Sequence, residues 1–293
     1  MKEIIRKVRR LELKIRKLVD TTFAGEYLSA FKGQGLEFDE VRPYQYGDDI
    51  RSIDWNVTAK TGQVYIKQFR EEREQVLFVL FDVSGSEDFG PTGENKRLIG
   101  MEIASLLAFS ALKNNDKIGM VTFSDRIEKY YKPEKGRKHI LKIVRGVLTQ
   151  TSKSMGTDLA HALDFVRHTL KRRSILLIIS DFIDDQYESA LIQLSHRHEV
   201  ILIRLFHPNE VSPVRAGIIP VMDIESGTMG WINAADTQYR EQIARAFADL
   251  DQRLEALSKR YDIGYIPVST QADYLQPLER YFKMRNHQRK QHR

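Results

Sequence analysis

A run of apolar residues from Val76 to Phe81 leads directly into the small polar stretch Asp82-Val83-Ser84-Gly85-Ser86. The run is rich in Val, Leu and Phe and shows no polar alternation, which is typical of a strand covered on both faces in a parallel sheet. In open α/β sheets, ligands bind at the carboxyl ends of such strands. The sequence therefore predicts a parallel sheet with a candidate site in the loop that follows this strand.

After Phe81 the chain alternates predicted strands and helices. This order predicts an α/β fold with a doubly wound, mostly parallel sheet whose crossovers are right-handed. The predicted helices cover 96–113, 137–148, 158–172, 186–197, 237–259 and 272–284. The predicted strands cover 116–124, 174–180, 199–206 and 262–268, with an antiparallel edge at 128–132 and a short hairpin or irregular extension at 218–224 and 230–232.

The N-terminal residues 2–19 carry aliphatic side chains at helical spacing, with basic side chains on the outer flank. They predict an amphipathic helix that packs on the protein's own body; a partner or a second copy is the alternative. The whole chain is thus expected to contain an N-terminal helix (1–24), a small β-rich module (25–73), an α/β domain (74–285) and a basic tail (286–293).

Composition limits the classes of function. The formal net charge is only +6. The chain has no cysteine, and this absence excludes disulfides, thiolate metal sites and cysteine nucleophiles. No apolar stretch reaches about 18 residues and the N-terminus lacks a signal-peptide block, so we expect a cytoplasmic protein with no membrane span. A nonspecific nucleic-acid binder remains an alternative, but aromatic residues are not interleaved with the basic ones, so nucleic acid is not the expected partner.

The module at 25–73 combines short β-prone pieces at 36–41 and 64–69 with a high density of charged and aromatic side chains. Charges are costly to bury unpaired, so we interpret them as an ion-pair and hydrogen-bond network that pins the module to the next domain. The alternative is an anion-binding surface of Arg42, Arg51 and Lys60. The residues assigned to the network are Arg42, Tyr44, Asp48, Asp49, Arg51, Asp54 and Trp55.

Three loops are expected at one edge of the sheet, and all of them carry oxygen ligands. They are the Asp82–Ser86 loop, Gly156-Thr157-Asp158 before a helix, and Ser180-Asp181 after a second buried strand. A hard cation such as Mg²⁺ prefers six oxygens at about 2.0–2.1 Å, and Mn²⁺ or Ca²⁺ are alternatives. The predicted direct ligands are Ser84, Ser86 and Thr157, with Asp82 and Asp181 holding bound waters.

In such a site the positive charge of the metal ion is only partly neutralised, because the protein ligands that bind it directly are uncharged. We therefore expect it to recruit an acidic residue of another protein rather than to catalyse a reaction, and no catalytic residue is assigned. A metal-assisted phosphoesterase that uses Asp82 and Asp181 is the enzymatic alternative. We rank this enzyme below the protein-interaction module because the sequence contains no phosphate-binding glycine loop and no evident catalytic lysine.

The three loops resemble the metal-ion-dependent adhesion site of von Willebrand factor A domains over roughly residues 74–268. Upstream, Gly33-x-Gly35-x-Glu37-Phe38, Arg42-x-Tyr44, Gly47-Asp48-Asp49-x-Arg51-x-Ile53-Asp54-Trp55 and Ala59-Lys60 resemble the bacterial domain-of-unknown-function 58 family. The adhesion-site residues would be Asp82, Ser84, Ser86, Thr157 and Asp181.

That resemblance implies an adaptor or cochaperone that acts with a MoxR-type AAA+ ATPase. Two residues depart from the family pattern: Glu87 stands where methionine is usual, and Lys60 where arginine is usual. Glu87 adds negative charge beside the proposed ion, which favours cation binding and disfavours an acidic partner.

Overall fold

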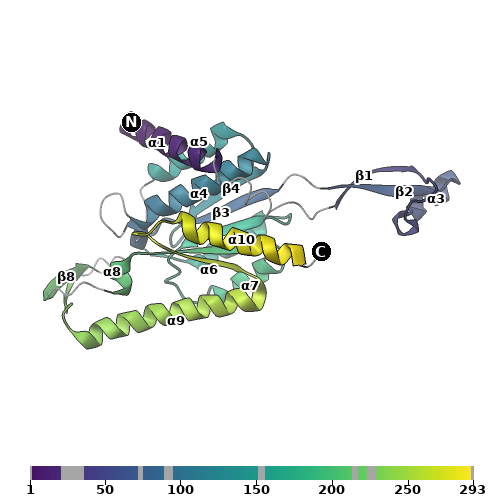
Figure 1. Ribbon diagram of the computed structural model, residues 1–293. Helices are drawn as coiled ribbons and strands as arrows, with labels where there is room; N and C mark the ends of the chain where they lie inside the picture. The colour runs from purple at the N-terminus through teal and green to yellow at the C-terminus, as the bar shows by residue number, and fades with distance from the viewer. Residues whose placement is uncertain are drawn as a thin grey trace. The chain divides into compact units, whose positions relative to one another are not determined.

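The computed structural model describes residues 2–20, 36–71, 75–88, 95–150, 156–212, 217–222 and 229–291. The chain forms two compact units, which are Met1–Ala30 together with Val76–Arg293, and Phe31–Gln75 (Figure 1).

The larger unit is built on a six-stranded sheet with the order β10-β7-β6-β3-β4-β5. Five strands are parallel, and β5 pairs antiparallel with β4 at one edge. This confirms the predicted doubly wound, mostly parallel α/β fold and the antiparallel edge. The strands are β3 (Val76–Asp82), β4 (Lys117–Phe123), β5 (Ile127–Glu134), β6 (Ile175–Ser180), β7 (Glu199–Phe206) and β10 (Gly264–Ser269).

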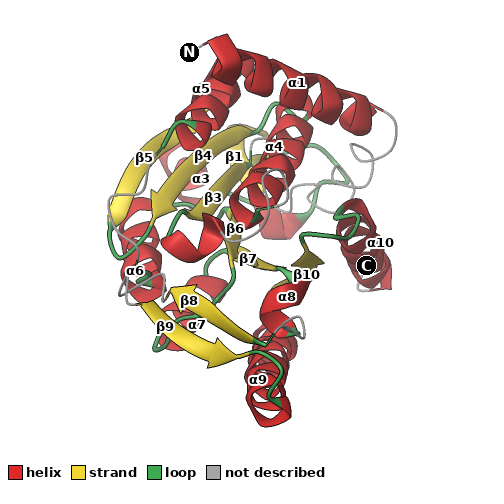
Figure 2. Cartoon of the chain, turned by 90° about the vertical axis from the view of Figure 1, so that its left-hand side faces the viewer, coloured by secondary structure: helices red, strands yellow, loops and turns green. Residues whose placement is uncertain are grey.

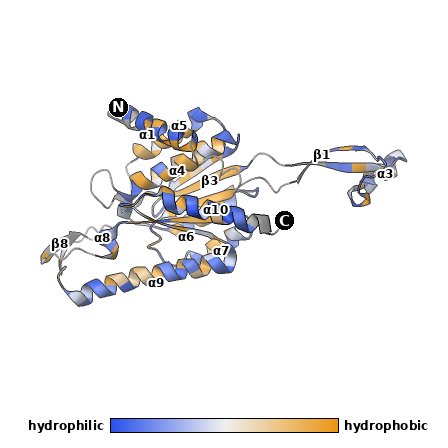
Figure 3. Cartoon of the chain, in the orientation of Figure 1, coloured by the Kyte–Doolittle hydropathy of each residue, from blue (hydrophilic) through white to orange (hydrophobic). Residues whose placement is uncertain are grey.

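Helices cover both faces of this sheet (Figure 2). On one face lies α4 (Lys96–Lys113), whose hydrophobic residues are coloured orange in Figure 3. Its Gly100 lies so close to the strands that an added Cβ would fall 2.9 Å from Leu205 Cδ1 and 3.1 Å from Ile179 Cγ2. The glycine therefore sets how closely α4 packs on β6 and β7.

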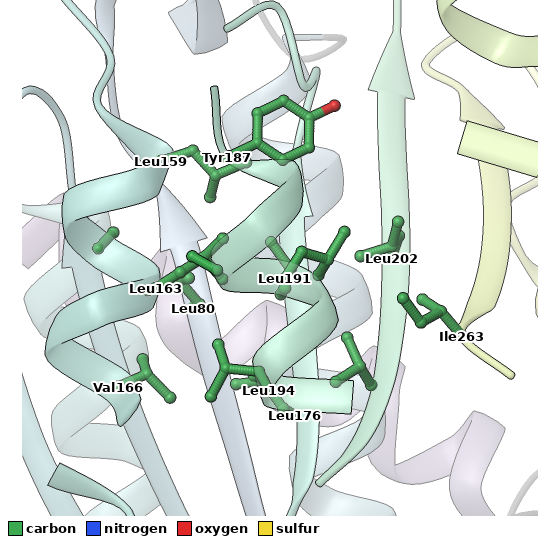
Figure 4. Close-up of a cluster of buried hydrophobic side chains, with 14 of the residues drawn as sticks. Leu80, Leu159, Leu163, Val166, Leu176, Tyr187, Leu191, Leu194, Leu202 and Ile263 are labelled. Carbon is green, nitrogen blue, oxygen red and sulfur yellow. The ribbon is translucent and has the colours of Figure 1, made fainter. Parts of the chain in front are cut away.

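The opposite face is covered by α6 (Leu159–Thr169), α7 (Glu188–Ser195) and α9 (Thr237–Tyr261). Leu163 of α6 and Leu191 of α7 pack against Leu80 and Leu202 of the strands (Figure 4). Because alternate strand residues point to opposite faces, β3 contributes Leu80 to this cluster and Phe81 to the α4 side. Burial on both faces explains why the central strands β3 and β6 contain almost no polar residues.

The N-terminal helix α1 (Lys2–Leu18) packs on the larger unit, where it contacts α4 and α5 (Arg137–Leu148). Leu11 and Ile15 are buried, as the helical spacing of its aliphatic residues predicted. Glu12 of α1 accepts a 2.5 Å hydrogen bond from Arg137 of α5. The interpretation that α1 covers the protein's own body is therefore confirmed.

The last helix, α10 (Leu275–Gln291), is longer than predicted. We expected a helix that ended at Met284 and a tail beyond it, but the helix continues through Gln291. Arg285 anchors this extension because its guanidinium lies 2.6 Å from Glu199 and donates a 2.9 Å hydrogen bond to Tyr281 Oη.

The predicted hairpin is present as β8 (Ile218–Met222) paired antiparallel with β9 (Met229–Asn233). A short helix, α8 (Pro208–Val211), follows β7 and begins with a capping box in which Glu210 accepts a hydrogen bond from the His207 backbone. This box fixes Glu210 at the carboxyl end of β7.

The smaller unit is a two-stranded antiparallel ribbon of β1 (Leu36–Pro43) and β2 (Tyr65–Glu71). Between them lie a 3-10 turn at Ile50–Ser52 and the helix α3 (Trp55–Thr61). The strands were predicted, but α3 was not. Its signals are local: Asp54 caps its first amides, and Gly62 ends it at φ 73°.

Candidate metal centre

The carboxyl ends of β3 and β6 bring the first and third predicted loops together. The two strands pair in parallel with Phe81 opposite Ile179, so that Asp82 and Ser180 are neighbours. Ser180 Oγ donates a 2.7 Å hydrogen bond to Asp82 Oδ2. Asp181 follows directly and is buried. The two aspartates predicted to share a site therefore do lie at one edge of the sheet.

The Asp82–Ser86 loop turns sharply and presents its hydroxyls side by side. Asp82 Oδ1 accepts a 2.9 Å hydrogen bond from the Ser84 amide, and Ser84 Oγ lies 3.2 Å from Ser86 Oγ. A 3-10 turn begins at Gly85. Asp82 and Ser84 are buried, whereas Ser86 is partly exposed.

Thr157 lies in the segment that enters α6, and two hydrogen bonds place this segment. The Asp158 amide donates to Ser124 O at the end of β4 (3.0 Å), and the Leu159 amide donates to Asp184 Oδ2 in the loop after β6 (2.7 Å). Because β3 lies between β4 and β6, the segment lies at the same edge as Asp82. Thr157 itself is partly exposed, and among the described residues no hydrogen bond joins it to the serine pair.

A third carboxylate, that of Glu87, completes a buried acidic cluster with Asp82 and Asp181. One carboxylate oxygen from each of the three lies within 4.8 Å of the others. Glu87 is only 1% exposed, and neither of its carboxylate oxygens has a hydrogen-bond partner in the described part of the chain. Buried polar groups are normally satisfied, so the two oxygens of Glu87 mark a place where a ligand is expected.

Lys96, which the sequence interpretation assigned only to a buried helix, contacts this cluster. Its Nζ lies 2.6 Å from Asp181 Oδ2 and 2.8 Å from Glu210 Oε1, and its side chain is fully buried. A cation in the first turn of a helix opposes the helix dipole, and here it also begins a strongly apolar helix. A lysine at this position of the sequence is therefore a signal from which a buried acidic partner could have been predicted.

Burial and charge shift the pKa values of these groups in a consistent way. Burial, reinforced by the charge of Asp181, raises the pKa of Asp82 to about 6. Burial also raises the pKa of Glu87 well above its usual value, although Lys96 opposes this. Burial alone would lower the pKa of Lys96, but the charges of Asp181, Glu87 and Glu210 outweigh it and raise this pKa. Lys96 therefore stays an ammonium and is unsuited to act as a base.

The cluster contains four carboxyl groups, those of Asp82, Glu87, Asp181 and Glu210, against the single ammonium of Lys96. Without a further cation, burial of this negative charge favours the protonated forms of Asp82 and Glu87, whose pKa values are raised. The donors are all oxygens, as a hard divalent cation requires. The residues present thus fit a divalent cation whose charge would replace those protons.

The charged residues of the smaller unit form a network within that unit. Arg42 forms a bidentate ion pair with Asp48, with N–O distances of 2.9 and 2.8 Å, and this pair raises the pKa of Arg42 and lowers that of Asp48. Asp49 accepts a hydrogen bond from the Arg51 amide, and Asp54 caps α3. Because Arg42 is already paired, the observed contacts favour the network over an anion-binding surface.

Three aromatic residues of this unit are exposed to solvent. Tyr44 and Trp55 are 36% and 66% exposed, and Tyr46 is fully exposed. The assignment of Tyr44 and Trp55 to the network stays a prediction. That this unit is pinned to the next domain stays a prediction.

A family model described as "Protein of unknown function DUF58" matches residues 40–260, which is more than half of the 293 residues. The chain belongs to the DUF58 family. The predicted family is thereby confirmed, and the matched range includes the motifs from Arg42 to Lys60.

This DUF58 protein is similar to the uncharacterized protein Rv1480 of Mycobacterium tuberculosis, with 29% identity over 281 residues that cover 95% of this chain and 88% of the relative. Among solved structures it is similar to BatB from Bacteroides thetaiotaomicron, with a TM-score of 0.46 and 12% identity over 72% of this chain and 98% of that one. It is also similar to the SpRpn10 VWA domain, with a TM-score of 0.39 and 12% identity over 70% and 93%.

In the described ranges of this DUF58 protein, no helix is both long and apolar enough to cross a lipid bilayer.

Proposed function

We propose that this protein is a metal-dependent protein-interaction module that acts as an adaptor or cochaperone for a MoxR-type AAA+ ATPase in the cytoplasm. One observation carries the proposal: three buried carboxylates from the two loops that follow β3 and β6 meet within 4.8 Å at the ligand-binding edge of a parallel sheet. The ATPase partner comes from the family resemblance alone.

The site is proposed to hold Mg²⁺, with Mn²⁺ or Ca²⁺ as alternatives. Ser84, Ser86 and Thr157 would bind the ion directly, and Asp82 and Asp181 would hold its waters, because both aspartates already accept hydrogen bonds. Glu87 is an additional direct ligand in this proposal, since its oxygens are buried without partners. A bound divalent cation would hold together the loops that follow β3 and β6.

The position of Glu87 changes the expected relation to an acidic partner. An adhesion site with only neutral direct ligands needs an external carboxylate, whereas Glu87 supplies one from within the chain. The ligands at the outer side of the site are Ser86 and Thr157, which are partly exposed. We therefore propose that an acidic residue of a client approaches from that side and competes with Glu87.

Binding to the ATPase tests this proposal. The purified protein and a MoxR-type ATPase from the same genome are mixed with Mg²⁺ or with chelator, and complex formation is measured by gel filtration and interferometry. We expect a complex only with Mg²⁺ and loss of it in Asp82→Asn. A complex that is equally strong with chelator would contradict the metal-dependent role.

One observation favours the phosphoesterase alternative: Lys96 is a lysine in contact with Asp181. The sequence interpretation had found no such lysine. Both oxygens of Asp82 accept hydrogen bonds, however, and Asp82 and Lys96 are buried, so neither is placed to meet a substrate. Release of phosphate from generic phosphoesters with Mg²⁺, abolished in Lys96→Met, would support this alternative, and no turnover at high protein concentration would dismiss it.

A further inference from the structure

A pocket of about 790 Å³ lies between α1, β5 and α5, away from the metal centre. Figure 2 shows these three elements gathered at one corner of the larger unit. Its volume is within the range of about 300–1,000 Å³ that is usual for small-molecule sites. The apolar part of its wall includes Val8, Leu141 and the ring of Tyr131.

The pocket carries a strong excess of positive charge. Its only carboxylate is that of Glu12, which already pairs with Arg137. The other five cations have no ion pair with any residue that the structure describes. The six cations of the lining are Arg9, Lys129, Arg137, Lys138, Lys142 and Arg145.

A buried hydroxyl in the lining also lacks a partner. Tyr131 is only 4% exposed, and its Oη makes no hydrogen bond with the described residues. Lys129 Nζ lies 5.3 Å from the centre of its ring. Gly146 gives this hydroxyl its space, because a Cβ there would fall 1.8 Å from Tyr131 Oη. A buried donor of this kind needs an acceptor, and none of the residues that the structure describes provides one.

The start of α5 adds a third feature. Its N-cap residue is Gly136, so no side chain caps the helix, and its first turn contains no acidic residue. Arg137 and Lys138 of that turn line the pocket. Uncapped amides and the positive end of the helix dipole favour an anion at this position.

We propose that this pocket binds a nucleoside polyphosphate. The cations and the start of α5 would bind the phosphates, Tyr131 Oη would donate to a ligand oxygen, and the apolar wall would hold the base. The proposal does not depend on the metal centre, because none of the residues predicted to bind the metal lines this pocket.

Calorimetric titration of the full chain with ATP, in chelator and at fixed ionic strength, tests this site. Lys129→Ala combined with Arg145→Ala should weaken binding by at least about tenfold, since charge-assisted hydrogen bonds to phosphate are lost. Tyr131→Phe keeps the ring and should weaken binding severalfold. Lys132→Ala is the matched control, because Lys132 is an exposed cation on the same strand and does not line the pocket.

Adenosine and inorganic tripolyphosphate separate the two parts of the ligand, and both should bind more weakly than ATP. The proposal is overturned if ATP does not bind, or if Lys132→Ala weakens binding as much as the pocket variants. It is also overturned if tripolyphosphate binds as tightly as ATP, or if only vesicles of anionic phospholipid bind. Because chelator is present throughout, these results are independent of the metal-dependent role.

Discussion

At the scale of single residues, Lys96 and Glu87 determine the balance of buried charge in the metal centre. Lys96 is a permanent cation buried between Asp181 and Glu210, and Glu87 is a buried carboxyl group without a hydrogen bond. Burying charges is tolerated only when they are paired, so each of these groups depends on the others. A change at either one should affect stability, metal binding, or both.

Lys96→Met keeps the length of the side chain and removes its charge. Asp181 and Glu210 then lose their buried partner, so we expect the free energy of unfolding to fall by about 3–5 kcal/mol. The matched control is Lys14→Met, since Lys14 also pairs with a glutamate but is 52% exposed, and this change should cost less than about 1 kcal/mol. Urea unfolding of the two variants measures both values. Equal losses of unfolding free energy in the two variants would show that the buried ion pairs of Lys96 stabilise the protein no more than the exposed pair of Lys14.

His198 should make the protein less stable in acid. Burial, with the charges of Arg197 and Arg173, lowers its pKa to about 4 from the usual 6.5. Between these two pH values, His198 is protonated in the unfolded chain but remains neutral in the folded chain. The free energy of unfolding therefore falls as the pH drops from about 6.5 to about 4.

His198→Gln removes this titration. We expect the difference in unfolding free energy between wild type and variant to change by about 2 kcal/mol across that pH window, and not above it. Urea unfolding at a series of pH values gives both curves. Parallel curves from pH 7 to pH 4 would mean that the pKa of His198 is not lowered.

At the scale of elements, hydrophobic pattern predicts the strands and helices of the sheet well. The run from Val76 to Phe81 and the alternation after it are strong signals because both faces of each strand must be apolar. The end of α10 could not be predicted in this way, since its last turns are polar and depend on Arg285 meeting Glu199 of a distant strand. The short helix α3 depends on caps at Asp54 and Gly62 rather than on pattern.

Gly100→Ala tests the packing of α4 on the sheet. Alanine favours helix by about 1 kcal/mol over glycine, but its Cβ would fall 2.9 Å from Leu205, 3.1 Å from Ile179 and 3.2 Å from Phe81. Overpacking of this kind costs about 1–3 kcal/mol. We therefore expect net destabilisation of up to about 2 kcal/mol in thermal or urea unfolding. A more stable variant would show that α4 can shift without cost.

At the scale of the whole molecule, the candidate site depends on strands and loops that are far apart in sequence. The topology could be predicted, and with it the meeting of Asp82, Asp181 and the segment of Thr157, because the carboxyl ends of neighbouring parallel strands share an edge. The contacts of Lys96 with Asp181 and Glu210 could not, since they join residues 85 and 114 positions apart. A cation bound only by the folded chain should stabilise these loops as a unit.

Thermal unfolding with and without Mg²⁺ tests the central claim, that a divalent cation binds at the carboxyl edge of β3 and β6. Mg²⁺ at about 100 times its Kd should add about 2.7 kcal/mol to the unfolding free energy and raise Tm by several degrees. NaCl at the same ionic strength should not reproduce this rise, and Asp82→Asn and Thr157→Ala should abolish it. A wild-type Tm that does not respond to Mg²⁺, Mn²⁺ or Ca²⁺, or an equal rise in both variants, would contradict the account.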